Sequence, residues 1–458
     1  MLTTASAFVF LALWVAAETV GGFRNPYAGL VAVVLLPTLF VLGLLLIPIG
    51  LLLAIRRSRR GPLEPTAWPV LDLNRPAARR GLLAVGVLTI VNVIILSMGS
   101  YGAVDHMDSP AFCGRTCHTP MQPQYEAWQQ GPHANVACVE CHIGAGAQAF
   151  LRYKWNGVHQ LVGVVSGRFP RPIPAPVKNL RPAAEICGPC HSQWKGHGDR
   201  PRTVREYADD AAGTETTTTF AVHVTQGEPV VLAGGGRHWP KGTGVHWHAD
   251  PSNRVEYASD EKREQILWVK VTTPEGTTRE YTAEGISPDA VAKAGHRVMD
   301  CVDCHNQPVH QFPTSAARAV DEAIAAGRLK RGLPFVRREG VRLLGVEAPS
   351  QEEGLRAIDA GLRAFYAPGG GASKEATGAL AAGASAAADP LAVDQAVAAL
   401  QAIFRRSVYP SMKITFGTYH NHLGHDDNLG CMRCHDQSHT AADGTVLPSD
   451  CDLCHTQP

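Results

Sequence analysis

Twelve cysteines, arranged as six close pairs, constrain this 458-residue chain more than any other feature. In each pair the second cysteine is followed directly by a histidine. Five pairs have the spacing C-x-x-C-H, and the first pair has one more residue, C-x-x-x-C-H. The cysteines are Cys113, Cys117, Cys138, Cys141, Cys187, Cys190, Cys301, Cys304, Cys431, Cys434, Cys451 and Cys454, and the histidines are His118, His142, His191, His305, His435 and His455. A chain with this pattern must organise its fold around whatever the six motifs bind.

The C-x-x-C-H spacing is the attachment signature of c-type haem. The two thiols add to the two vinyl groups of the haem, and the adjacent histidine reaches the iron as an axial ligand. At the Cys and His frequencies of this chain, chance would produce only about 0.01 such matches. Zinc sites and disulfides are the alternatives, but neither needs a histidine after every second cysteine. The sequence therefore predicts six covalently bound haem c groups, the first through a longer link that still reaches both vinyl groups.

The histidines outside the motifs are candidates for the second axial position of each iron, because electron-transfer haems normally carry two axial ligands. His246 and His248 flank Trp247, and on a strand both would point to the same face, so we expect one of them, His246, to reach a haem. His159, His223, His238, His296 and His420 are weaker candidates. The strongest candidates lie near the attachment sites: His133, His197, His310, His422, His425 and His439.

Three apolar stretches precede the first motif. Residues 29–55 and 81–101 are each long enough to cross a hydrocarbon core of about 30 Å. Residues 2–20 form a weaker stretch without the basic start of a secretory signal, so we expect a retained span, with a helix lying in the membrane interface as the alternative. Seven arginines lie within residues 56–80. Because cytoplasmic loops carry the excess of Lys and Arg, the chain after Tyr101 is predicted to be periplasmic, anchored in a bacterial inner membrane.

Composition divides the chain into five predicted segments. Residues 1–101 form a membrane domain with two to three transmembrane helices, and 102–200 hold three motifs. Residues 201–295 lack a motif and alternate Thr, Val and Tyr at 216–224, 229–232, 265–272 and 277–282, which predicts a β-rich insertion. Residues 296–408 hold the fourth motif, predicted helices at 314–328 and 351–366, and a loose Ala/Gly-rich segment at 369–388. Residues 409–458 hold the last two motifs.

The predicted fold class is a membrane-anchored multihaem cytochrome c, with N-terminal transmembrane helices and a mostly helical or irregular, haem-packed periplasmic region. Residues 170–182 are rich in proline and predict an extended connector before the third motif. The β-rich insertion could form a partner-binding surface or a lobe that packs against haems, and the sequence leaves both open.

Two stretches carry a resemblance to a known family. They are F-C-G-R-T-C-H-T-P-M-Q-P-Q-Y-E-A-W at 112–128 and G-P-H-A-N-V-A-C-V-E-C-H-I-G-A-G at 131–146. With the apolar stretch before them, they resemble the NapC/NirT (NrfH-type) membrane-anchored multihaem cytochromes c over residues 82–200. The later run C-V-D-C-H-N-Q-P-V-H at 301–310 and the two terminal motifs resemble longer members of that family.

This resemblance implies a quinol-oxidising protein whose first haem lies next to the membrane. Relatives have C-x-x-C-H-x-M at that haem, where the Met can replace His as axial ligand. Here extra residues intervene, so the resemblance leaves His118 and Met121 both open as ligands. The family also has a lysine at the quinol site after the second motif, and Lys154 in F-L-R-Y-K-W-N-G matches it. The alternative for Lys154 is an interfacial lysine beside lipid headgroups. The acidic neighbour expected shortly after it is missing, and His159 occupies that region.

These observations predict a membrane-bound hexahaem c-type cytochrome of the quinol dehydrogenase type. It would oxidise (mena)quinol and pass electrons along its haems to a periplasmic or membrane protein. One alternative is a terminal reductase of a small oxyanion or nitrogen compound, although no C-x-x-C-K variant occurs. Another is an electron-transfer subunit of a larger respiratory complex without its own quinol site. The balance of 42 basic and 41 acidic residues gives no basic field for nucleic-acid binding.

Overall fold

The structure is a computed structural model. It describes residues 49, 52–53, 56, 73–116, 118–144, 147–177, 180–191, 198–224, 230–231, 237–238, 244–250, 252–372 and 388–456. The predicted span at 2–20, and all but a few residues of the one at 29–55, lie outside this range. The chain forms two compact units, Met1–His118 and Thr119–Pro458. The predicted segments at 201–295, 296–408 and 409–458 all lie in the second unit.

In the described part of the first unit, the longest element is helix α4 (Pro76–Asp108), which includes the apolar stretch at 81–101. Proline suits the first helical position because its missing N–H has no partner there in any helix. The helix ends before Ser109, whose hydroxyl donates to the His106 carbonyl at 2.7 Å. A π-helix, η2 (Phe112–Thr116), follows. Within the described residues, none of the helices combines the length and the apolar character needed to cross a membrane.

Short helices carry the early motifs of the second unit. They are α5 (His118–Gln130), α6 (Cys138–His142), α7 (Ala147–Val165) and α8 (Ala183–Ile186). Residues 168–177 between α7 and α8 form neither helix nor strand, in agreement with the predicted connector, and include cis peptide bonds at Arg171–Pro172 and Ala175–Pro176.

The β-rich region consists of hairpins and one larger antiparallel sheet. β1 (Asp199–Tyr207) pairs with β2 (Glu215–His223), and β3 (Val230–Val231) pairs with β4 (Arg237–His238). The larger sheet has the order β8-β5-β6-β7-β9. Its strands are β5 (Arg254–Ser259), β6 (Ile266–Thr272), β7 (Thr278–Ala283), β8 (Gly295–Val298) and β9 (His439–Ala441). The C-terminal segment therefore supplies one edge strand of the inserted sheet.

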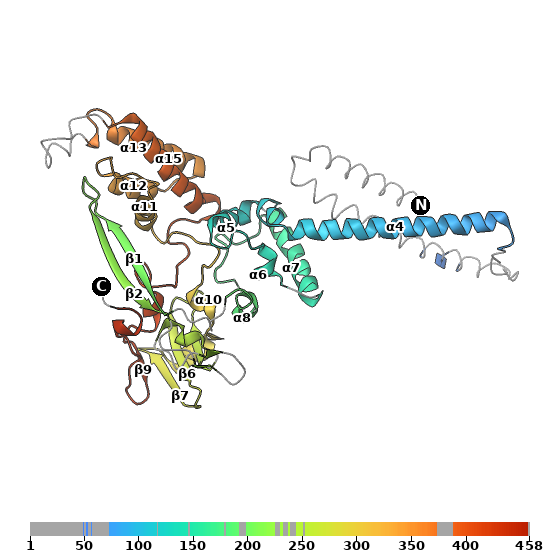
Figure 1. Ribbon diagram of the computed structural model, residues 1–458, viewed down its shortest axis with the longest axis horizontal. Coiled ribbons are helices and arrows are strands. Elements are labelled where there is room, and N and C mark those ends of the chain that lie inside the picture. Colours follow the sequence, from blue (N-terminus) through green and yellow to red (C-terminus); the bar gives the residue numbers. More distant parts are fainter. Residues whose placement is uncertain are drawn as a thin grey trace. The chain divides into compact units, whose positions relative to one another are not determined.

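Residues 315–372 and 388–407 form a helical lobe without a cysteine pair (Figure 1). It comprises α11 (Ala316–Ala325), α12 (Val336–Leu344), α13 (Gln351–Tyr366) and α15 (Pro390–Ser407). Ser315 and Ser350 cap α11 and α13 by accepting hydrogen bonds from backbone amides, which satisfies one otherwise unpaired donor at each helix start. Buried Leu343, Ile358, Leu362, Leu400 and Phe404 pack together, and Tyr207 of β1 joins this core. The lobe thus holds the β1–β2 hairpin on one side.

The remaining short elements lie around the later motifs. They are η3 (Val245–Ala249), α9 (Pro288–Lys293), α10 (Cys301–Cys304), η4 (Pro410–Met412), η5 (Gly430–Arg433) and η6 (Cys451–Leu453). Three of them, α10, η5 and η6, are built from the cysteine motifs themselves.

Candidate haem sites

The C-x-x-C-H motifs share one local conformation, a single helical turn. We number the sites 1 to 6 in chain order. Site 2 is the short helix α6, Cys138–His142. At sites 3 to 6 the histidine amide donates to the carbonyl of the first cysteine: His191 to Cys187 at 2.7 Å, His305 to Cys301 at 2.8 Å, His435 to Cys431 at 3.1 Å and His455 to Cys451 at 3.1 Å. Positions i, i+3 and i+4 share one face of such a turn. The two thiols and the imidazole therefore belong to the same side of the chain, as attachment to one haem requires.

The extra residue of site 1 coincides with a π-helix. In C-x-x-C-H the histidine follows the first cysteine by four positions, which is the spacing of an α-helical hydrogen bond. In C-x-x-x-C-H it follows by five positions, which is the spacing of a π-helical one. The π-helix η2 spans Phe112–Thr116 and so includes the inserted residue within one wider turn. Cys117 and the side chain of His118 lie outside the described part of the structure.

Each motif histidine of sites 2 to 6 faces a second histidine. Two imidazoles bound to opposite sides of one iron, through bonds of about 2 Å, have ring centres about 6 Å apart. The ring-centre distances are 6.3 Å for His142–His310, 5.8 Å for His191–His133, 6.4 Å for His305–His246, 5.7 Å for His435–His248 and 6.1 Å for His455–His425. The residues present therefore fit a haem iron at all five sites.

Backbone carbonyls orient several of these rings. A ring that donates from Nδ1 presents the lone pair of Nε2 to a metal. Nδ1 lies 2.9 Å from the Pro308 carbonyl in His133, 2.8 Å from that of Gln124 in His310, 3.1 Å from that of Val245 in His248 and 2.7 Å from that of Thr456 in His455. These contacts favour the tautomer in which Nε2 is the ligand atom.

Burial also keeps several of these imidazoles in the form that binds metal. Desolvation lowers the pKa of His142, His248, His305 and His310. The neighbouring His142 ring lowers the pKa of His310 further, and His191 does the same for His305. Because only the neutral imidazole binds a metal, these surroundings favour ligation.

The His246-Trp247-His248 segment is a 3-10 helix and not the strand we considered. In a helix of three residues per turn, positions two apart point in different directions. Accordingly His246 faces His305 of site 4, whereas His248 faces His435 of site 5. The expectation that one of the two would reach a haem missed the placement of His248. The H-W-H pattern correctly drew attention to this segment, but its backbone is a 3-10 helix in place of the strand.

Three other predicted ligands have no facing motif histidine in the described structure. Two of them, His422 and His439, are described, and the third is not. His197 lies outside the described range. His439 is 1% exposed, with Nε2 at 3.1 Å from the Ile266 carbonyl and Nδ1 at 3.2 Å from the Ser438 hydroxyl. Both of its ring nitrogens are therefore engaged by the protein. His422 is also buried, and its Nδ1 lies 3.2 Å from the Asp303 carbonyl beside site 4.

Met121 and Lys154 lie on α5 and α7, and both are half-buried. Beside Lys154, α7 presents an exposed apolar stripe at helical spacing. Its members are Trp155, Val158, Val162 and Val165, which are 70%, 52%, 61% and 78% exposed.

The attachment cysteines of sites 2 to 5 lie close enough to influence one another. Burial raises the pKa of Cys187 to about 11, and the nearby thiols of Cys301 and Cys141 contribute to this shift. Burial likewise raises the pKa of Cys304 to about 11, with Cys431 contributing. Motifs that are consecutive along the chain, 2 and 3, 3 and 4, and 4 and 5, therefore lie near each other.

Site 6 continues this series and is held by the β1–β2 hairpin. The pKa of Cys454 is raised by burial and by Cys431 of site 5. The amide of His223 on β2 donates to the Cys454 carbonyl at 2.8 Å. The ring of Phe220 lies 5.0 Å from that of His455. The inserted region thus packs against the later sites, and its 3-10 helix η3 supplies two of their facing histidines.

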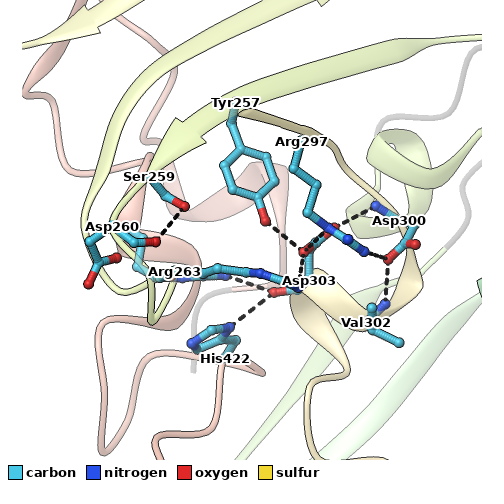
Figure 2. A network of polar contacts seen from close by, with 10 residues as sticks. Tyr257, Ser259, Asp260, Arg263, Arg297, Asp300, Val302, Asp303 and His422 are labelled. Atoms are coloured by element: carbon cyan, nitrogen blue, oxygen red, sulfur yellow. Dashed lines mark hydrogen bonds and ion pairs between the residues drawn. The ribbon is translucent and has the colours of Figure 1, made fainter. Parts of the chain in front are cut away.

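Site 4 contains a buried carboxylate that ties the motif to the larger sheet (Figure 2). Asp303 is 2% exposed and accepts hydrogen bonds from the Tyr257 hydroxyl at 2.6 Å, from Arg263 at 3.0 Å and from Arg297 at 2.9 Å. It also accepts from the Asp300 amide at 2.8 Å, which completes a capping box for α10. Burial, followed by the charge of Asp303, raises the pKa of Tyr257, so the phenol remains a donor.

The eleven cysteines other than Cys117 form no disulfide in the described structure. In the same part of the chain, no group of three or more His, Cys, Asp or Glu side chains is placed to hold a metal ion. The metal-binding geometry found there is that of the facing histidine pairs.

Comparison with known proteins agrees with the sequence resemblance. Residues 75–172 match the sequence model of the NapC/NirT cytochrome c family, N-terminal region. The chain is also 36% identical over 447 residues to the cytochrome c-type protein ImcH of Geobacter sulfurreducens, a match that covers 96% of this chain and 83% of that protein. No solved structure matches the chain. The chain therefore belongs to the NapC/NirT family of multihaem c-type cytochromes, and its cofactor is covalently bound haem c.

Proposed function

We propose that this cytochrome carries six haems, oxidises menaquinol at the membrane and conducts the electrons to a periplasmic or membrane protein. The observation that supports this most is the unbroken series of five facing histidine pairs. An iron with two histidine ligands has no open position for a substrate, which is the property of an electron-transfer haem. Family membership supports the same conclusion for the chain as a whole.

In this proposal the motif histidine and its facing histidine would hold the haem iron at each of sites 2 to 6. The haems supply one-electron redox chemistry when bound. Burial lowers the pKa of His142, His248, His305 and His310 and so favours their neutral form. Backbone carbonyls orient several of the rings. At site 1 the iron ligand is His118 or Met121. Electrons would enter at site 1 and leave from the C-terminal end of the series.

Contact with the membrane is supported by the exposed stripe on α7. Apolar side chains with a tryptophan at one end are typical of a helix that lies in the membrane interface. Lys154 precedes this stripe, so its ammonium group can donate a hydrogen bond to a quinol oxygen at the lipid boundary. The apolar sequence at 81–101 would provide the anchor.

A quinol-reduction assay tests the proposal. The full-length protein in lipid nanodiscs is first analysed for haem, with six per chain expected, and is then mixed with menadiol as the menaquinol analogue. We expect rapid haem reduction, slowed by about tenfold or more in Lys154→Gln because a charge-assisted hydrogen bond is lost. The exposed Lys293→Gln on α9 is the matched control, and dithionite reduction should not change in either variant. Failure of menadiol to reduce the wild-type protein would refute the quinol step. A high-spin haem that turns over nitrite would instead indicate a terminal reductase.

A further inference from the structure

One arginine ties the attachment loops of sites 4 and 5 together. Arg433 lies inside the fifth motif, C-M-R-C-H. It donates from Nη2 to the Asp303 carbonyl at 2.9 Å, from Nη1 to the Arg263 carbonyl at 2.6 Å and from Nε to the Gly430 carbonyl at 2.8 Å. Within the described residues these bonds all go to backbone carbonyls and none to a carboxylate. The charge of Arg433 is therefore held in a fixed position between the two loops.

The carboxylates of the adjoining cluster are paired with other arginines. The carboxylate of Asp303 is paired with Arg263 and Arg297, and Asp300 is paired with Arg297 at 2.8 Å (Figure 2). Among these residues and Arg433 there are thus three guanidinium groups and two carboxylates, and neither carboxylate is paired with Arg433 in the described structure.

The positive charge of Arg433 also acts on the buried side chain of His422. His422 is 5% exposed, and burial lowers its pKa to about 4, with the charges of Arg433 and Arg263 contributing in the same direction. The imidazole is therefore neutral at physiological pH and adds no charge of its own.

We propose that Arg433 is a shared charge that raises the reduction potentials of haems 4 and 5, so that electrons passing along the chain reside on this pair. The inference rests on the proposed attachment of haems at both motifs. Reduction adds one negative charge to a haem, and a fixed cation stabilises that state more strongly in a partly buried site than in water. One residue can act on two haems because Arg433 lies in the fifth motif and bonds to the Asp303 carbonyl inside the fourth motif.

Redox titration of two Arg433 variants tests this proposal in the full-length, haem-loaded protein. In Arg433→Gln we expect the ferrous-to-ferric ratio of two haems to fall about tenfold at a fixed applied potential, which equals about 59 mV for a one-electron couple. Arg433→Lys should restore most of this loss, because lysine keeps the charge although it lacks the rigid fork that binds three carbonyls. Arg342→Gln is the matched control, since Arg342 bonds to Glu339 in the haem-free lobe.

A substitution at Asp303 should change the ferrous fraction in the direction opposite to Arg433→Gln. Asp303→Asn removes a negative charge from the same cluster and should raise the ferrous fraction of haem 4. If Arg433→Gln and Arg433→Lys change the reduction potentials of the same haems equally, the arginine acts only by holding the loops, and the proposal fails. It also fails if neither variant shifts any haem while all six remain attached. Wild-type protein that lacks haem at site 4 or 5 would contradict the proposed function instead.

Discussion

Replacing Asp303 by asparagine tests how firmly site 4 is held to the β-sheet. The carboxylate is 2% exposed, and its four donors lie 2.6–3.0 Å away. Asparagine removes the charge that compensates two guanidinium groups and turns one acceptor oxygen into a donor that faces other donors. Breaking a buried ion pair from one side costs about 3–5 kcal/mol. Arg263 and Arg297 remain 18% and 31% exposed, so we expect the lower end, about 3 kcal/mol of unfolding free energy.

Guanidinium unfolding of the haem-loaded protein, followed by far-ultraviolet circular dichroism, measures this loss. Haem content must match that of the wild type, so that the variant reports on the network and not on a missing haem. The control is Glu352→Gln, which breaks an exposed pair with Arg356 at 3.0 Å and should cost about 0.5 kcal/mol or less. Equal losses in the two variants would refute the argument that burial gives the Asp303 network its strength.

Three further predictions concern coordination, pH and packing. His310→Ala should leave the haem of His142 with an open position and produce a high-spin ferric signal in electron paramagnetic resonance, whereas His439→Ala should not. The pKa of His422 is lowered to about 4 from about 6.5 when unfolded, so its stabilising contribution is complete above pH 6.5 and falls as the pH drops toward 4. The stability advantage of the wild type over His422→Gln should therefore shrink by about 3 kcal/mol across that window, and a constant difference would contradict the assignment. Gly354→Ala would place a Cβ against the buried Phe404 ring, closer than van der Waals contact allows, and should destabilise the helical lobe by about 1–3 kcal/mol without changing the haem spectra.

The local spacing of the motifs allowed the candidate attachment residues to be predicted from the sequence. Covalent attachment needs two thiols and one imidazole on a single helical turn. All three groups lie within five consecutive residues, so a local pattern is enough to predict them. The same holds for α13, whose predicted bounds of 351–366 are confirmed as Gln351–Tyr366. The helix α15 was not predicted, although Asp389 and Pro390 at its start and the buried Val393, Val397 and Leu400 along one face carried the signal.

Partners that meet across the fold could not be assigned in the same way. His310 follows the fourth motif yet faces the histidine of the second, and no local pattern relates the two. The strand β9 has only three residues, and it is a strand because β7 lies beside it. The π-helix at site 1 is an intermediate case, because the sequence showed the inserted residue but not the wider turn that accommodates it.

The facing pairs also bear on how the protein is made. If the chain is exported from its N-terminus, as the proposed periplasmic location requires, Cys138 and Cys141 become available for haem attachment long before His310 has crossed the membrane. Under the proposed ligation, haem 2 would spend that interval with one protein ligand, while haem 3 could pair with His133 as soon as its own motif emerged. The order in which haems are attached would then differ from the order in which they become six-coordinate. A chain truncated after residue 200 would carry three haems and a complete axial pair at only one of the two sites described there.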